Sequence, residues 1–191
     1  MENFIGIYKN SLSSENCQRI IEWFEKTTHR HREGEFHSAD EGNKKIVNKD
    51  VKDSIDIALD FEDDSWVTNT ILSSIQDGLE KYKSKYTQLD NCLPVWGLTK
   101  GYNLQRYLPG GGYKTLHCEN QQKNNGRVMA WMIYLNTVED KGGTYFSSYD
   151  LTEKAEEGKL LIWPAYWTHT HKGIPSPTES KYIATGWFEF A

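Results

Sequence analysis

The stretch YLPGGGYKTLHCEN, Tyr107 to Asn120, joins a glycine-rich turn to a histidine and a glutamate two residues apart. The glycines at 110–112 separate two candidate strands, near 102–108 and 113–119. Residues two apart in a strand point to the same face, so His117 and Glu119 can offer an imidazole and a carboxylate to one ion. Cys118 would point away from that ion. The stretch therefore predicts strands that carry part of a metal site.

A second imidazole must come from elsewhere, and the run WTHTHKG supplies His169 and His171. Two histidines and one carboxylate form the facial set that leaves open positions on ferrous iron. The motif alone is weak, because His-x-Glu occurs by chance and a strand histidine is often a hydrogen-bonded structural residue. The remaining histidines, at positions 29, 31 and 37, have no partner at ligand spacing and are expected on the solvated surface.

The chain after Pro94 consists of short runs rich in β-branched and aromatic residues, punctuated by glycine and proline. The candidate strands lie near 102–108, 113–119, 128–136, 143–148, 158–163, 167–172 and 181–189. Helices followed by such strands predict a mainly β fold: a double-sheet jelly roll, or double-stranded β-helix, with N-terminal helices packed against it. We expect one domain over 1–191, helical over about 1–93 and β over about 94–191.

Two helices and a loop are expected before the strands. A short strand from Phe4 to Tyr8 precedes a helix that Ser13 or Ser14 could cap. A second helix begins near Val67, where apolar residues recur at steps of three and four. The polar segment between about 29 and 52 shows no sustained period and predicts a mobile loop, which could close over a substrate.

Composition limits the remaining classes. The net charge of −5 is modest and spread along the chain, so nucleic acid is not an expected partner. The chain has no signal-peptide pattern and no apolar run of membrane-spanning length, so we expect a soluble cytoplasmic protein without a membrane partner. Cys17, Cys92 and Cys118 form no paired-thiol spacing and are expected to be idle thiols.

From Gly101 to Phe190 the chain resembles the prolyl 4-hydroxylase-like branch of the 2-oxoglutarate and Fe(II) oxygenases. The resemblance rests on ordered motifs: YLPGGGYKTLHCE, GRVMAWMIYLN, GGTYF, GKLLIWP, HKG and KYIATGWFEF. It implies a dioxygenase that hydroxylates a substrate C–H bond with Fe(II), 2-oxoglutarate and O2. A prolyl residue in a peptide is the first candidate substrate, and ascorbate is a candidate reductant whose need the sequence leaves open.

The resemblance also implies roles for individual residues. His117, Glu119 and His171 would be the catalytic iron ligands, and the H-x-G context favours His171 over His169. Lys181 would pair with the distal carboxylate of 2-oxoglutarate, since a buried dicarboxylate needs a cation. Two tyrosines, Tyr107 and Tyr134, would donate to the cosubstrate, whereas Arg127 and Trp187 would contact substrate. Ordinary packing or surface roles remain open for these last four, and Trp131, Trp163 and Trp167 are expected to be packing residues.

One feature departs from the pattern of this branch, where the carboxylate ligand is usually aspartate. The extra methylene of Glu119 moves its oxygens outward by about one bond length, which a different strand path could absorb. A retained carboxylate also argues against halogenation.

Two other readings stay open. The same ligands would suit a His2Glu zinc hydrolase, in which the cosubstrate residues would have no purpose. A non-catalytic binding module on the same fold is the third possibility. Small-molecule substrates also remain open, because the superfamily accepts many.

Overall fold

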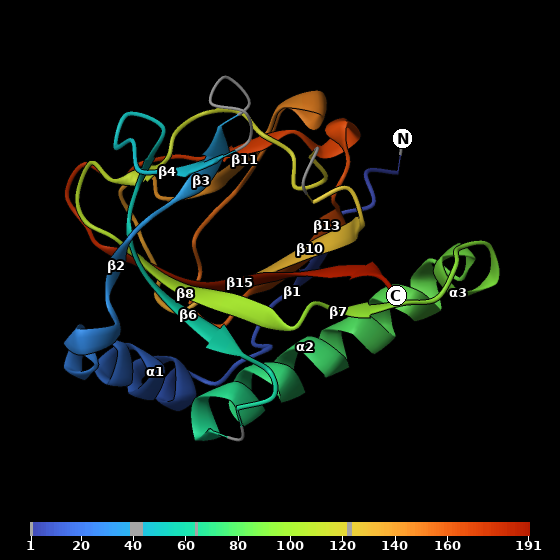
Figure 1. The fold of residues 1–191 in the computed structure, drawn as a ribbon, viewed down its shortest axis with the longest axis horizontal. Helices are drawn as coiled ribbons and strands as arrows, with labels where there is room; N and C mark the ends of the chain where they lie inside the picture. The colour runs from blue at the N-terminus through green and yellow to red at the C-terminus, as the bar shows by residue number, and fades with distance from the viewer. Residues whose placement is uncertain (1, 39–43, 64, 122–123) are drawn as a thin grey trace.

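Two helices lie under one face of a large antiparallel sheet, and smaller sheets lie over its other face (Figure 1). This computed structural model describes residues 2–38, 44–63, 65–121 and 124–191. Among these residues the largest sheet has eight strands, with β7 paired to one side of β15. In sheet order its strands are β1 (Gly6–Tyr8), β13 (Leu160–Pro164), β10 (Arg127–Tyr134), β15 (Lys181–Phe190), β8 (Gly101–Tyr107), β6 (Ile55–Asp60) and β2 (Arg32–Glu33), with β7 (Trp96–Leu98) beside β15.

The smaller sheets lie on the side of the large sheet away from the helices (Figure 1). One is formed by β12 (Leu151–Glu153), β11 (Thr144–Phe146) and β14 (His171–Gly173). Two strand pairs complete the set: β3 (Phe36–Ser38) with β4 (Lys44–Ile46), and β5 (Lys52–Asp53) with β9 (Gly112–Tyr113). The short helical turns are η1 (Thr28–Arg30), η2 (Ser147–Tyr149) and η3 (Trp167–His169). This description confirms a mainly β fold with flanking helices.

Each long helix begins at a serine cap. In α1 (Ser14–Lys26) the Oγ of Ser13 accepts a hydrogen bond from the backbone N–H of Asn16 at 3.2 Å. In α2 (Trp66–Lys85) the Oγ of Ser65 accepts one from Thr68 at 3.2 Å. Such caps satisfy backbone donors that the first helical turn leaves free. A short third helix, α3 (Gln88–Asn91), follows, and no helix of the described ranges is long and apolar enough to cross a membrane.

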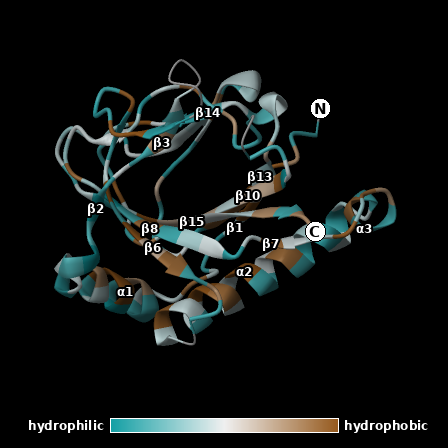
Figure 2. Cartoon of the chain, in the orientation of Figure 1, coloured by the Kyte–Doolittle hydropathy of each residue, from teal (hydrophilic) through white to brown (hydrophobic). Residues whose placement is uncertain are grey.

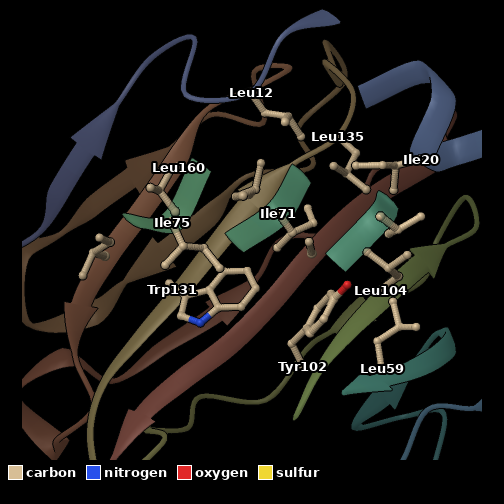
Figure 3. Packing of buried hydrophobic residues seen from close by; sticks show 14 of the residues in the cluster. Leu12, Ile20, Leu59, Ile71, Ile75, Tyr102, Leu104, Trp131, Leu135 and Leu160 are labelled. Atoms are coloured by element: carbon tan, nitrogen blue, oxygen red, sulfur yellow. The ribbon is translucent and has the colours of Figure 1, made fainter. Parts of the chain in front are cut away.

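Strand β10 is buried on both faces, which explains its unbroken run of apolar residues. On the helix side, Trp131 packs in one cluster with Ile71 and Ile75 of α2 (Figure 3). Ile133 belongs to the same cluster. Tyr134 and its same-face neighbours pack instead in a second cluster, on the side of the small sheets. Hydrophobic and hydrophilic residues alternate along α2, as expected for a helix that buries one face (Figure 2).

Several sequence-based expectations need correction. The N-terminal part is not simply helical, because β1, β2 and β6 all belong to the largest sheet. The expected loop between about 29 and 52 contains η1 and four short strands, and its residues 39–43 lie outside the described residues. The expected strands at 113–119 and 167–172 are mostly irregular: the first reduces to β9 and one isolated bridge, and the second begins as the turn η3.

The packing of α2 on the sheet should carry a large part of the stability. Ile75 is fully buried, so Ile75→Ala should lower the free energy of unfolding by about 2–5 kcal/mol through lost burial and a residual cavity. Chemical denaturation followed by far-UV circular dichroism measures the change. Gln76→Ala, at an exposed position on the same helical turn, is the matched control and should change stability by less than about 0.5 kcal/mol. Equal losses in both variants would contradict this account of the core.

Candidate metal centre

His117, Glu119 and His171 converge on one point. The Oε1 atom of Glu119 lies 3.6 Å from Nε2 of His117 and 3.4 Å from Nε2 of His171. Three ligand atoms, one from each residue, all lie within 4.8 Å of one another. Atoms that bind one ion at right angles, each about 2.1 Å from it, would be about 3 Å apart. The observed set is therefore slightly wider than an occupied site and fits a metal ion.

Backbone hydrogen bonds fix the tautomer of both rings. The Nδ1 of His117 donates to the carbonyl of Thr115 at 2.9 Å, and the Nδ1 of His171 donates to that of His169 at 2.8 Å. A carbonyl oxygen can only accept, so each Nδ1 carries the proton and each Nε2 presents a lone pair. Neutral imidazoles with free Nε2 atoms are the form that binds a metal.

The protonation states of the site agree with this arrangement. Burial, followed by the neighbouring His171, lowers the pKa of His117 below its ordinary value of 6.5. Burial alone would raise the pKa of Glu119, but the contacts with His117 and His171 hold it well below its ordinary value. At neutral pH the site therefore offers an anionic carboxylate and a neutral His117, ready for a divalent cation.

Backbone pairing brings the ligands together although the flanking segments are irregular. His117 and His171 exchange two hydrogen bonds, N–H to O, at 2.9 and 2.8 Å and so form an isolated antiparallel bridge. The N–H of Glu119 donates to the carbonyl of Ala165 at 2.9 Å. The expected side-by-side placement of His117 and Glu119 is correct, but a bridge produces it instead of a continuous strand.

The second carboxylate oxygen of Glu119 is held by the two residues that the sequence suggested as substrate contacts. The indole N–H of Trp187 donates to Oε2 at 2.7 Å, and a guanidinium N–H of Arg127 reaches the same atom at 3.3 Å. The guanidinium also stacks over the Trp187 ring, 3.5 Å from its centroid. Both side chains thus orient the carboxylate, and both also line the adjoining cavity.

A cavity of about 360 Å³ adjoins the three ligands. Lys181 lies on its wall, only 5% exposed, and its Nζ donates to the carbonyl of Gly142 at 2.8 Å. Tyr107 lines the same cavity, and its ring centroid lies 5.1 Å from Nζ of Lys181. Two of the three residues expected to meet the cosubstrate, Lys181 and Tyr107, therefore line the cavity that adjoins the metal ligands.

The expected site residue Tyr134 and the disfavoured ligand candidate His169 have other surroundings. The hydroxyl of Tyr134 is buried and lies 2.7 Å from Oγ1 of Thr144, and it is Thr144 that lines the cavity. His169 is directed elsewhere: its Nε2 lies 2.7 Å from the carbonyl of Asn3. The structure therefore brings His171, and not His169, into the ligand set.

Sequence reasoning missed other residues of the cavity wall. Tyr113 stacks on the ring of His117 with the centroids 3.7 Å apart. Thr144, Lys52 and His37 also line the cavity. Thr144 and Tyr113 stand within motifs that carry the resemblance, so their position near the ligands was a usable signal. Nothing in the local pattern marked Lys52 or His37, because both come from the segment expected to be a loop.

A two-histidine, one-carboxylate site with open positions, set in a mainly β fold beside a buried lysine, defines the class of non-haem iron oxygenases. Residues 102–189 match the family described as the 2OG-Fe(II) oxygenase superfamily. The resemblance seen in the sequence is thereby confirmed. Fe(II), 2-oxoglutarate and O2 are the cofactor and cosubstrates of this family, and the chain is a 2-oxoglutarate-dependent dioxygenase.

Solved structures with the same fold include several prolyl hydroxylases. A Pseudomonas putida prolyl-4-hydroxylase has a TM-score of 0.71 at 13% identity, with 99% of this chain and 94% of that chain covered. A viral collagen prolyl hydroxylase from Paramecium bursaria Chlorella virus-1 has a TM-score of 0.65 at 16% identity, with 98% of this chain and 97% of that chain covered. A Trichoplax adhaerens prolyl hydroxylase, solved with a hypoxia inducible factor peptide, has a TM-score of 0.72 at 18% identity, with 98% of this chain and 84% of that chain covered. No curated protein sequence matches the chain.

The contact between Trp187 and Glu119 should influence metal affinity. Trp187→Phe keeps an aromatic ring under Arg127 but removes the N–H that holds Oε2, so the Kd for Co(II) or Fe(II) should rise about 10–100-fold. Metal titration by calorimetry or Co(II) absorption measures it. Trp96→Phe is the matched control, because it removes an indole N–H bond to the carbonyl of Leu89 outside the cavity wall. Unchanged metal affinity in a folded Trp187→Phe protein would contradict the role assigned to this contact.

Proposed function

We propose that the chain hydroxylates a prolyl residue in a peptide, with Fe(II) bound by His117, Glu119 and His171 and with 2-oxoglutarate bound beside Lys181. The observation that carries the proposal is a buried lysine, in the cavity of the metal ligands, for which the described residues supply no acidic partner. Among the described residues, only the carbonyl of Gly142 is hydrogen-bonded to its Nζ. Burying an ammonium group without a counter-charge is costly, so the site suits an anionic ligand.

The residues around Lys181 fit a dicarboxylate cosubstrate. Lys181 would pair with its distal carboxylate, and the hydroxyl of Thr144, supported by Tyr134, is a hydrogen-bonding group on the same wall. Tyr107 completes this part of the cavity. Bound Fe(II) would supply the redox chemistry that couples oxidation of 2-oxoglutarate to succinate and CO2 with hydroxylation of the substrate. The protein's part is to hold the carboxylates, orient the ligands and exclude bulk water from the cavity.

Support for a prolyl substrate comes from the cavity wall and from the similar structures. Tyr113 and Trp187 line the cavity near the ligands, and such rings suit packing against an apolar pyrrolidine. Arg127 can donate to a peptide carbonyl with guanidinium protons that Glu119 does not use. The similar solved structures include prolyl hydroxylases, which agrees with this choice.

The same proposal covers the finer description of the fold. We assign the large sheet and the β12-β11-β14 sheet to the two sides of a double-stranded β-helix, or jelly roll, and the whole chain to one oxygenase domain. In support of this assignment, the ligand His171 begins β14, and Trp187 of β15 in the large sheet donates to the ligand Glu119. The helices support the opposite face of the large sheet.

A hydrolytic zinc enzyme on the same ligands explains less. It would leave Lys181 buried without a purpose. A binding module without chemistry could use Lys181 to hold a small acid, but it would have no need for the intact ligand set of His117, Glu119 and His171. Because zinc can occupy such ligands, metal content alone does not separate these functions, and turnover must be measured.

The experiment begins with anaerobic addition of Fe(II) and 2-oxoglutarate to the purified protein. We expect a visible charge-transfer band that is absent in His171→Ala and needs far more 2-oxoglutarate in Lys181→Ala. Succinate release with a proline-containing peptide, and a mass gain of one oxygen on the peptide, should then follow. A peptide with alanine in place of proline is the control. If the folded, iron-loaded protein gives no band, the oxygenase function fails; a band without peptide hydroxylation refutes only the prolyl substrate.

The pH dependence of 2-oxoglutarate binding provides a second test. Burial lowers the pKa of Lys181 to about 8, so without ligand the ammonium loses its proton as pH rises through that value. The half-saturating 2-oxoglutarate concentration should therefore be constant below pH 7 and increase above pH 8, approaching tenfold per pH unit. Titration of the charge-transfer band between pH 6.5 and 9, at about constant ionic strength, measures it. Lys181→Arg keeps its charge throughout and should remove the increase; an identical increase in that variant would refute this explanation.

A further inference from the structure

A row of buried polar side chains crosses the cavity wall on three neighbouring strands. In the sheet register Asp56 of β6 lies opposite Gln105 of β8, and Tyr107 of β8 lies opposite Lys181 of β15. Gln105 and Tyr107 are two residues apart and therefore share one face of β8. Asp56, Gln105, Tyr107 and Lys181 all line the cavity, as does Lys52.

The row begins at a buried ion pair. Nζ of Lys52 lies 2.6 Å from Oδ2 of Asp56, and the two side chains are 6% and 13% exposed. The hydroxyl of Ser54 donates to Oδ1 of Asp56 at 2.8 Å, and the amide Nε2 of Gln105 donates to Oδ2 at 3.0 Å. Asp56 is thus an ionised carboxylate surrounded by donors, an arrangement that stabilises a buried charge.

The donor and acceptor in each hydrogen bond from Asp56 to Tyr107 follow from the carboxylate of Asp56. A carboxylate only accepts, so Gln105 must turn its NH2 group toward Asp56 and its carbonyl oxygen toward Tyr107. That oxygen accepts from the hydroxyl of Tyr107 at 2.7 Å. Burial, and after it the charge of Asp56, raises the pKa of Tyr107 well above its ordinary value, so the phenol keeps its proton. The hydroxyl end of Tyr107 is therefore held in one place.

The ring of Tyr107 in turn contacts the ammonium of Lys181. The 5.1 Å between Nζ and the ring centroid is a cation–π contact, which is strongest where water is excluded. Among the described residues, the other partner of this Nζ is the carbonyl of Gly142, which accepts its hydrogen bond. The position of the Tyr107 ring therefore helps to determine where the charge of Lys181 is presented in the cavity.

We propose that the Lys52–Asp56 ion pair and Gln105 form a positioning network that acts through Tyr107 on Lys181 and so sets the affinity of the enzyme for 2-oxoglutarate. This inference rests on the proposed function, because Lys181 is assigned there to the cosubstrate carboxylate. None of the three residues needs to touch the cosubstrate. They are positioning residues, and Tyr107 transmits their effect.

Lys52 also links this network to another part of the cavity wall and to the metal side. Its Nζ donates to the carbonyl of Glu35 at 3.3 Å, between β2 and β3. Its backbone pairs in register with Tyr113, the residue that stacks on the ligand His117. The placement of residues 32–38 and 52–53 is thus connected with both the cosubstrate end and the metal end of the cavity.

The test removes the network without changing Lys181. Gln105→Leu is close in shape and loses the amide, and Tyr107→Phe loses only the hydroxyl. Each should raise the half-saturating 2-oxoglutarate concentration about tenfold in anaerobic titration of the Fe(II) band, and in Gln105→Leu kcat at saturating 2-oxoglutarate should stay within about twofold of the wild type. The rise in melting temperature caused by 2-oxoglutarate should be smaller in the same variants, a readout that requires no turnover.

The double variant makes the test specific for a network. If Gln105 acts through Tyr107, the effects of Gln105→Leu and Tyr107→Phe should not add. The double variant should then have a half-saturating 2-oxoglutarate concentration no higher than that of the more affected single variant. Glu25→Gln is the matched control, because Glu25 forms an ion pair at 2.8 Å with Arg106. Arg106 is on the same strand as Gln105, but neither Arg106 nor Glu25 lines the cavity. The control variant should leave 2-oxoglutarate binding unchanged even if stability falls.

Three results separate the outcomes. The network would be overturned if folded Gln105→Leu had the half-saturating 2-oxoglutarate concentration of the wild type, or if the two effects were fully additive in the double variant. If Gln105→Leu does not fold, Tyr107→Phe and Asp56→Asn are compared instead, and a normal half-saturation in both overturns it equally. Absence of the band in the wild type would instead refute the proposed function, so the two failures are distinct.

Discussion

The carboxylate of Glu119 is the interaction on which the site depends, because its two oxygens have different partners. Oε1 faces the Nε2 atoms of His117 and His171, whereas Oε2 accepts from Trp187 and Arg127. A carboxylate fixed at one oxygen presents the other as a single, directed ligand. The strands that supply these partners are distant in sequence, so the site requires the assembled sheet: Arg127 begins β10 and Trp187 belongs to the adjacent β15.

This division of the carboxylate also explains how a glutamate can stand where aspartate is usual in the related branch. The extra methylene gives one more rotatable bond, whose freedom would blur the ligand position. The bond from Trp187 at 2.7 Å removes that freedom, and stacking of Arg127 on the same indole, 3.5 Å from its centroid, holds the indole in turn. The longer ligand is therefore accompanied by a support that orients it.

Sequence patterns predicted the elements whose side chains pack against one another. Steps of three and four residues placed a helix from near Val67, and it runs from Trp66 to Lys85. The alternating run KYIATGWFEF predicted β15, and the ligand set was found because spacing and resemblance agreed. Strand β6 was missed even though Ile55, Ile57 and Leu59 alternate with smaller or polar residues, which is a readable strand signal.

The segment around the cavity could not be predicted in the same way. Strands β2 to β5 are only two or three residues long, too short to show a period, and backbone pairing defines them. The roles of Arg127 and Trp187 toward Glu119 were likewise hidden, because residue type and position fit a substrate contact equally well. Which oxygen a side chain reaches depends on the register between β10 and β15, and spacing within either strand does not reveal that register.

Three buried lysines show why local sequence does not reveal which charge is functional. Lys159 lies 3.2 Å from Glu153, and Lys52 lies 2.6 Å from Asp56, so each has a carboxylate that offsets the cost of burial. Lys181 is as buried as Lys52, but the part of the chain that the structure describes places only a carbonyl and an aromatic ring beside its Nζ. Burial lowers the pKa of Lys181 to about 8. The protein can hold such a group only at a cost in stability, and a dicarboxylate that enters the cavity and supplies the charge would recover that cost as binding free energy.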